Sequence, residues 1–285
     1  MRKPIHLLHL CIGMIALASC TGKLTSLVPD TPSKAPDYFC TWNTQGYAVS
    51  YTGPDMMRSA MTEENIFGKG QHQNWVSFFP KIREDLYFVM DDSWDIPKNE
   101  NSANRNPHLG MCELDEGRFP SFRGTPAERL GQLTMRIKQE GWKGAGGWIC
   151  AQQADGHEHQ SEEEYWTERL KAANEAGFSY WKVDWGHKDR NEGWRRMLTR
   201  LGKKYAPNLW IEHAMHGHFI RFSDVFRTYD VENIIAQPLT IRRVVELLPH
   251  KSEDESKGLI NCEDEPYIAV GLGCAIGIMR HPMDG

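Results

Sequence analysis

Short apolar runs recur along this chain, and stretches with helical periodicity separate them. The clearest run, at residues 180–186, is aromatic and β-branched with one lysine inside it, and it ends in an aspartate, a tryptophan and a glycine. A run without turn residues is typical of a buried strand in a parallel sheet. We predict further strands at residues 38–43, 86–90, 144–151, 208–214, 224–230, 258–262 and 278–279.

Capping residues and apolar spacing predict helices between these strands. Thr125 and Glu128 form a capping box with Pro126 at the first helical position, and Ser161 with Glu164 forms a second box. Apolar residues recur at spacings of three and four after both boxes, and again at 194–201 and 241–248. A glycine- and alanine-rich helix is expected before the last strand. Residues 96–123 show no periodicity and predict a long loop after the second strand, over the candidate site described below.

The alternation of strands and helices predicts one α/β domain, a (β/α)₈ TIM barrel over residues 37–285. The alternative is an open doubly wound sheet, but no glycine-rich phosphate loop follows the first strand. A chain of 285 residues, 40% of them hydrophobic, is large enough to bury such a core. The formal charge of −5, without a basic stripe, argues against nucleic acid as a partner.

The first 36 residues indicate targeting rather than fold. Two basic residues precede an apolar run over residues 5–17, which is short for a permanent membrane span. The run closes in a Leu-Ala-Ser-Cys sequence that resembles a bacterial lipoprotein signal, with Cys20 as the lipidated residue; the alternative is a plain secretory signal. We therefore expect a signal peptide over 1–20, a flexible tether over 21–36, and a protein that is lipid-anchored in the bacterial cell envelope or secreted.

The cysteines and histidines give little sign of a disulfide framework or a metal site. Once Cys11 and Cys20 are set aside, five of the seven cysteines remain, widely spaced and without a Cys-x-x-Cys pair. Histidines occur at 157–159 and 213–218, but the first strand lacks the His-x-His of metal-dependent hydrolase barrels. We expect these histidines to line polar loops, and we expect neither a metal nor a cofactor.

Carboxylates stand at the ends of four predicted strands: Asp91 with Asp92, Asp184, Glu212 and Asp230. In such a barrel the active site is built at the carboxyl ends of the strands. A single buried carboxylate there is typical of a turn cap, but carboxylates at four strand ends together indicate a site. Glycoside hydrolysis requires two carboxylates that flank the scissile bond. Lys182 shares a strand face with Asp184, and a cation nearby keeps a nucleophilic carboxylate ionised.

These motifs, in this order, resemble the melibiase-type α-galactosidase clan of glycoside hydrolases, which includes the α-N-acetylgalactosaminidases. Asp91-Asp92-Ser93-Trp94 resembles the clan's second-strand Asp-Asp-x-Trp, and residues 181–184 resemble its fourth-strand Lys-x-Asp. Trp-Asn at 42–43 resembles its first strand, residues 226–230 its sixth, and residues 210–212 fall where the fifth strand selects the sugar 2-position. The resemblance covers residues 38 to about 283.

The resemblance implies a role for each matching residue. Asp184 would be the nucleophile, and Asp230 the acid/base, of a retaining α-galactosidase that cleaves glycans. Glu212 and Arg227 together would hold a 2-hydroxyl and so favour α-galactosides over α-N-acetylgalactosaminides. Trp148 on the third strand either stacks on the sugar or packs, and both remain open. The implied substrate-binding residues are Trp42, Asp91, Asp92, Trp94, Lys182, Glu212 and Arg227, with Trp148 as a further candidate.

Two departures from the clan matter. Arg227 and Asp230 are three residues apart where one branch has four; the other branch matches better, and Asp224 is the fallback acid/base. The chain also stops after the predicted eighth strand, without the clan's last barrel helix and C-terminal β-sandwich. The alternative hypothesis is therefore a glycan-binding lipoprotein without catalysis. Residues 263–265, Glu-Asp-Glu, are expected to form a solvated loop.

Overall fold

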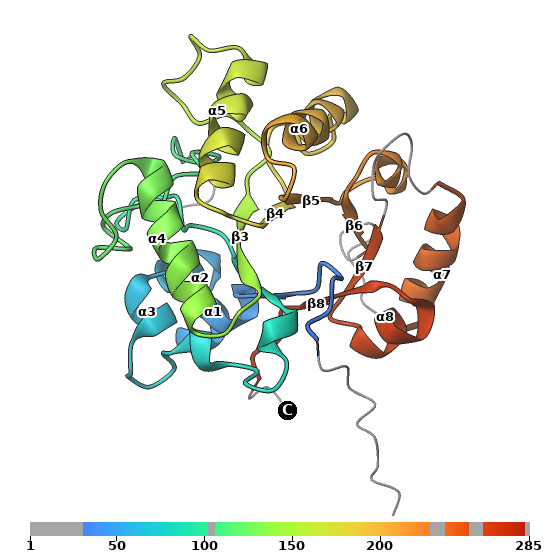
Figure 1. Cartoon of the computed structure of the whole chain (residues 1–285), viewed down its shortest axis with the longest axis horizontal. Coiled ribbons are helices and arrows are strands. Elements are labelled where there is room, and N and C mark those ends of the chain that lie inside the picture. The colour runs from blue at the N-terminus through green and yellow to red at the C-terminus, as the bar shows by residue number, and fades with distance from the viewer. Residues whose placement is uncertain (1–30, 102–105, 229–236, 251–258, 283–285) are drawn as a thin grey trace, which may run out of the picture. The chain divides into compact units, whose positions relative to one another are not determined.

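Eight parallel strands close into a barrel in chain order (Figure 1). The computed structural model describes residues 31–101, 106–228, 237–250 and 259–282. Each strand pairs with its neighbours in sequence, and β8 pairs with β1 to close the ring. The predicted (β/α)₈ barrel is thereby confirmed. The strands are β1 (Tyr38–Cys40), β2 (Tyr87–Met90), β3 (Gly144–Ile149), β4 (Tyr180–Val183), β5 (Trp210–His213), β6 (Val225–Arg227), β7 (Leu259–Glu263) and β8 (Ala275–Ile278).

Helices surround the strands in Figure 1. They are α1 (Trp42–Ala48), α2 (Pro54–Ser59), α3 (Glu63–Phe67), α4 (Pro126–Gln139), α5 (Glu162–Glu175), α6 (Glu192–Tyr205), α7 (Gln237–Leu247) and α8 (Pro266–Leu272). Short 3₁₀ turns are η1 (Trp75–Ser77), η2 (Arg83–Asp85), η3 (Gly217–Arg221) and η5 (Leu248–His250). In the described ranges, no helix has the length and apolar character needed to cross a membrane.

Both predicted capping boxes are present. The Thr125 hydroxyl accepts from the backbone N–H of Glu128, whose carboxylate accepts from the backbone N–H of Thr125. Ser161 and Glu164 make the same reciprocal pair at the start of α5. Because these contacts satisfy backbone donors that a helix start leaves unpaired, the sequence locates both helix starts to the residue.

The first strand is shorter than predicted. β1 ends at Cys40, and Trp42, which we placed in the strand, begins helix α1. Thr41 adopts a helical backbone conformation, and its carbonyl accepts from the N–H of Gln45. The Thr41 hydroxyl also bonds to the Gln45 side chain, so a local polar pair turns an apolar stretch into a helix.

The last strand begins earlier than predicted, at Ala275. Gly277 on β8 lies opposite Tyr38 on β1 and Glu263 on β7. A Cβ atom at Gly277 would stand 2.7 Å from the Asn261 side chain and 2.8 Å from the Tyr38 ring. The barrel therefore closes here only because this position has no side chain.

The inside of the barrel changes character along its axis. Tyr38, Val89 and Tyr180 form part of an apolar cluster inside the ring. Two residues further along β2 and β4, the inward positions carry charge: Asp91 follows Val89, and Lys182 follows Tyr180. Successive inward residues of a strand lie about 6.6 Å apart along it. The apolar layer inside the barrel therefore lies directly beneath a charged layer nearer the carboxyl ends of the strands.

Candidate active site

The carboxyl ends of the strands surround a cavity of about 650 Å³. Among the residues predicted from the sequence, its lining includes Trp42, Asp91, Asp92, Trp148, Lys182, Asp184 and Arg227. These residues come from distant parts of the chain, and the barrel brings them together. The lining also includes Arg58, Glu263, Asp264 and Met279, which the sequence did not identify as site residues.

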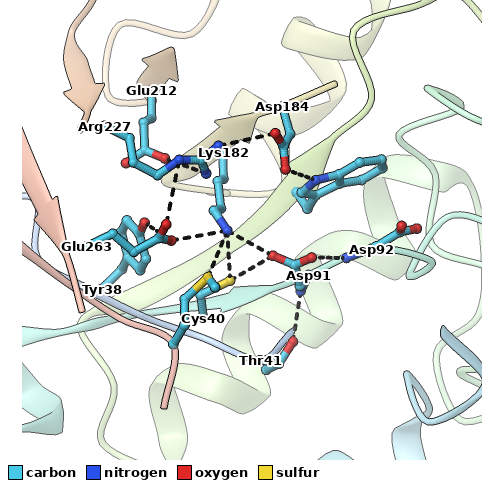
Figure 2. Close-up of polar contacts among 12 residues, drawn as sticks. Tyr38, Cys40, Thr41, Asp91, Asp92, Lys182, Asp184, Glu212, Arg227 and Glu263 are labelled. Carbon is cyan, nitrogen blue, oxygen red and sulfur yellow. Dashed lines mark hydrogen bonds and ion pairs between the residues drawn. The ribbon is translucent and has the colours of Figure 1, made fainter. Parts of the chain in front are cut away.

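Asp184 directly follows β4 and lies between two donors (Figure 2). Trp148 Nε1 donates to Asp184 Oδ2 at 2.8 Å, and Arg227 Nη2 donates to Asp184 Oδ1 at 3.2 Å. The Asp184 side chain keeps 18% of its surface exposed, toward the cavity. Burial alone would raise the pKa of Asp184, but the charges of Arg227 and Lys182 and the Trp148 hydrogen bond outweigh it, and the pKa is lowered. Asp184 is thus an ionised carboxylate with access to the cavity.

Lys182 lies below Asp184, and its ammonium group is surrounded by carboxylates (Figure 2). Lys182 Nζ lies 3.1 Å from Asp91 Oδ2 and 3.2 Å from Glu263 Oε1. It also lies 3.2 Å from the Met279 sulfur and 3.5 Å from the Cys40 sulfur. Burial opposes the charged amine, but the negative groups around it, Asp91 foremost and Glu263 among the others, together outweigh burial, and the pKa of Lys182 is raised well above its ordinary value. The cavity floor therefore holds a fixed positive charge.

The paired aspartates after β2 have different partners. Asp91 Oδ2 accepts from Lys182 and from the Cys40 thiol, while Asp91 Oδ1 accepts from the backbone N–H of Asp92. Asp92 Oδ2 accepts from Arg58 Nε at 2.8 Å. Burial raises the pKa of Asp92 to about 6, although Arg58 acts in the opposite direction. Both carboxylates are held rigidly at the cavity wall.

Glu212 is placed differently from what we expected. It is the strand partner of Lys182, so it lies one inward position deeper than Asp184, and it is not among the cavity-lining residues. Its carboxylate accepts from the Tyr180 hydroxyl at 2.7 Å and from Arg227 at 3.3 Å. Glu212 therefore acts beneath Arg227, and Arg227 is the member of the pair that reaches the cavity.

The buried Glu212 carboxyl predicts a pH dependence of stability. Burial raises its pKa from 4.5 to about 7, although Arg227 acts in the opposite direction. A raised carboxyl pKa contributes stability that is fully present below the unfolded-state pKa and is lost as pH rises through the folded-state value. The unfolding free energy of the wild type should therefore fall as pH rises from about 5 to about 8. In Glu212→Gln we expect this fall to be smaller, by up to about 3 kcal/mol.

Denaturant unfolding of both proteins at the two pH values measures this effect. Glu175→Gln is the matched control, because Glu175 is exposed on α5 and should leave the pH dependence unchanged. An identical pH dependence in wild type and Glu212→Gln would contradict a raised pKa at Glu212. Asp92 and Asp95, whose pKa values burial raises to about 6 and about 7, contribute in the same direction in both proteins.

The three tryptophans occupy different positions. Trp42 and Trp148 line the cavity, and Trp148 also contacts Asp184. Trp94 is fully buried, outside the set of cavity-lining residues. Its Nε1 donates to the Trp148 carbonyl, and its ring lies against Gly147, where a Cβ atom would come within 2.8 Å of it. Trp94 thus supports β3 from behind, which differs from the sugar contact that we expected.

The sequence offers two candidates for the acid/base, Asp230 and Asp224. Asp230 lies outside the described residues, so its role stays a prediction. Asp224, the fallback, directly precedes β6 and accepts from the backbone N–H of Ile211 at 3.1 Å. It stands at the amino end of its strand, away from the cavity, and the structure excludes it as the acid/base.

Glu263 is the most important residue that sequence reasoning missed. We expected residues 263–265 to be solvated, but Glu263 ends β7 and is 2% exposed. It accepts from the Tyr38 hydroxyl at 2.7 Å and lies 3.7 Å from Arg227 Nε, in addition to its contact with Lys182. Its position at a strand end was the available signal, because the same rule identified Asp91 and Asp184.

The histidines of the described ranges occupy separate positions. His213 is fully buried, and its ring contacts Arg195 and Thr199 on α6. His216 lines the cavity, while the rings of His157 and His159 lie near each other in the loop after β3. Across the described residues, no group of three or more His, Cys, Asp or Glu side chains is arranged to hold a metal ion.

Known structures share this fold. No protein-family model and no curated protein matches the chain by sequence. A GH27 β-L-arabinopyranosidase from Geobacillus stearothermophilus aligns with 87% of the chain at 11% identity and a TM-score of 0.55. α-Galactosidase I from Mortierella vinacea aligns with 86% at 17% identity and a TM-score of 0.52. Both are similar to this chain in fold, and they belong to the kinds of enzyme to which the sequence motifs pointed.

The chain is shorter than these structures. It spans 72% of the arabinopyranosidase and 66% of the Mortierella enzyme. A candidate α-galactosidase from Bacteroides fragilis aligns with 68% of the chain at 18% identity and a TM-score of 0.44, and the chain spans 37% of its length.

Proposed function

We propose that this chain is a retaining glycoside hydrolase of the melibiase-type clan that removes terminal α-galactoside-type sugars from glycans. The observation that carries the proposal is Asp184: an ionised carboxylate, held by Trp148 and Arg227, that faces the cavity of a GH27-like barrel. A nucleophile must be deprotonated and positioned, and both conditions are met here. The fixed charges of Asp91, Asp92 and Lys182 supply partners for sugar hydroxyls.

In the proposed reaction, Asp184 attacks the anomeric carbon and forms a covalent glycosyl-enzyme while the leaving oxygen is protonated. The residue that donated this proton then acts as a base and deprotonates a water molecule, which hydrolyses the intermediate with net retention. Asp230 is the proposed acid/base on the strength of the sequence motif. The contact between Arg227 and Asp184 keeps the nucleophile charged until it attacks, because a nearby cation favours the ionised form.

Turnover of an aryl α-galactoside by the purified full chain tests the proposal. Release of the phenol, with retained configuration of the sugar by NMR, is the expected result. Binding of galactose without turnover would instead support the alternative, a glycan-binding protein without catalysis. Aryl β-L-arabinopyranoside belongs in the same assay, because the Geobacillus structure is that of an arabinopyranosidase.

We also expect a preference for the α-galactoside over the α-N-acetylgalactosaminide. Arg227 is held from below by Glu212 and from above by Asp184, so it has little freedom to withdraw from an acetamido group. A polar group left unpaired in a buried site costs about 1–3 kcal/mol, which corresponds to a preference of about 5- to 150-fold in kcat/KM. Equal kcat/KM values on the two aryl glycosides would show that Arg227 does not face the 2-position.

The location of the protein is a separate proposal. Residues 1–30, which hold the candidate signal and Cys20, lie outside the described residues. We propose lipid attachment at Cys20. Labelled palmitate should enter the wild-type protein in bacteria but not Cys20→Ser, and equal labelling of both would disprove the anchor.

A further inference from the structure

Two cysteines, one on β7 and one directly before β8, belong to the same cluster of apolar residues. Cys262 lies on β7, where Ile276 of β8 is its strand partner. Cys274 lies two residues before Ile276 and directly precedes β8. Asn261 and Glu263, on either side of Cys262, belong to the inward face of β7, so Cys262 points outward. Cys262 is fully buried there, and half-buried Cys274 packs against the same cluster of apolar residues.

The two thiols contact each other. A hydrogen bond between the side chains raises the pKa of Cys262 and lowers the pKa of Cys274. The other described cysteines bond to oxygen atoms instead: Cys40 to the Asp91 carboxylate, Cys112 to the Gly110 carbonyl and Cys150 to the Trp185 carbonyl. Among the cysteines that the structure describes, Cys262 and Cys274 are thus the pair with thiol-to-thiol contact.

We propose that Cys262 and Cys274 are a redox-active pair that closes into a disulfide when the protein meets a thiol oxidant. The oxidant is a disulfide, either of low molecular weight or on an oxidoreductase. Cys274 reacts first, because it is the more exposed thiol and the one whose ionisation the contact favours.

The exchange balances in two steps. The Cys274 thiolate attacks one sulfur of the oxidant, forms a mixed disulfide and releases the other half as a thiolate. Cys262 then loses its proton and attacks the Cys274 sulfur, which expels the second half. The oxidant gains two electrons and becomes two thiols, and these take up the two protons lost by the cysteines.

The bond would close a loop that carries part of the cavity wall. Residues 262–274 contain Glu263, which contacts Lys182, Asp264, which lines the cavity, and the whole of α8. A cross-link between the ends of this segment restricts the unfolded chain and holds β7 against β8. Oxidation would therefore stabilise the side of the site that Glu263 and Asp264 form.

Peptide mapping of the purified full chain tests the proposal directly. The protein is first reduced with dithiothreitol, freed of reductant and then exposed to oxidised glutathione. Trypsin should release residues 258–280 as one peptide that contains both cysteines and has lost about 2 Da, the mass of two hydrogen atoms. Cleavage after Glu263 by Glu-C protease should leave two peptides that separate only after reduction.

Stability provides the second readout. Oxidation should raise Tm by about 5 °C, and dithiothreitol should reverse the rise. Cys274→Ser should abolish both the mass loss and the redox dependence of Tm, whereas Cys112→Ser, the matched control with a carbonyl partner, should keep both. Free thiols at both positions after oxidation, or a stable glutathione adduct on Cys274 that Cys262 does not resolve, would overturn the proposal; either is read in the wild-type protein.

Discussion

Asp184→Asn is expected to lower kcat/KM on an aryl α-galactoside by at least about 10³-fold. Asparagine is nearly isosteric with aspartate but cannot form the glycosyl-enzyme, so the loss should not depend on the leaving group. In the wild type, two donors hold the carboxylate, Trp148 at 2.8 Å and Arg227 at 3.2 Å, and both favour the charged form. Steady-state kinetics on glycosides with good and poor leaving groups measure the effect.

Two further variants separate a chemical role from a structural one. Asp189→Asn changes an aspartate in the same loop that does not line the cavity, and it should leave kcat/KM within about 3-fold, since it touches no reacting group. Asp184→Gly opens space for azide, which should attack the anomeric carbon from the vacated side and give a glycosyl azide of inverted configuration. Turnover of Asp184→Asn at the wild-type rate, or a glycosyl azide of retained configuration, would exclude Asp184 as the nucleophile.

The barrel was predictable because local signals and the global pattern agree. Apolar runs alternate with capped helices, and the boxes at Thr125 and Ser161 locate two helix starts. The main error of this kind, at Trp42, arose because one polar contact between Thr41 and Gln45 ends the strand, and apolar periodicity does not detect such contacts.

The site was predictable only in part. The sequence indicates which residues stand at strand ends, but it does not indicate how deep in the barrel each side chain lies. Lys182 and Glu212 are partners across β4 and β5, which places Glu212 a full inward position below Asp184. That offset depends on how the strands are staggered around the closed barrel, and no single strand contains the information. Glu212 therefore appeared to be a sugar contact, although it supports Arg227 from beneath.

Composition misled the interpretation of Glu263 for a related reason. Three consecutive acidic residues are typical of a solvated loop, and burial of the first becomes visible only when its partners are known. Tyr38, Lys182 and Arg227 reach Glu263 from three other strands. The contact between Cys262 and Cys274 was missed in the same way, because it depends on the register of β7 against β8.

Lys182→Met should be among the most destabilising substitutions in this chain. The change nearly keeps the length of the side chain but removes the charge, and it leaves Asp91 and Glu263 without the cation that they share at 3.1 and 3.2 Å. Removing one partner from a buried ion pair costs about 3–5 kcal/mol, which predicts a fall in Tm of about 6–20 °C. Thermal unfolding followed by circular dichroism measures this, and hydrolysis should be lost as well, because the cavity floor loses its positive charge.

A double-mutant cycle distinguishes an uncompensated charge from simple loss of packing. Glu263→Gln removes one of the two carboxylates that lose their cation in Lys182→Met. The double variant Lys182→Met/Glu263→Gln should therefore be more stable than Lys182→Met alone, by about 0.5–3 kcal/mol. Glu263→Gln alone should destabilise the protein, because Lys182 then keeps only Asp91 as a close carboxylate partner. If the two single losses simply add in the double variant, Lys182 and Glu263 are not coupled. Glu263 would then have no part in holding the lysine beneath the nucleophile.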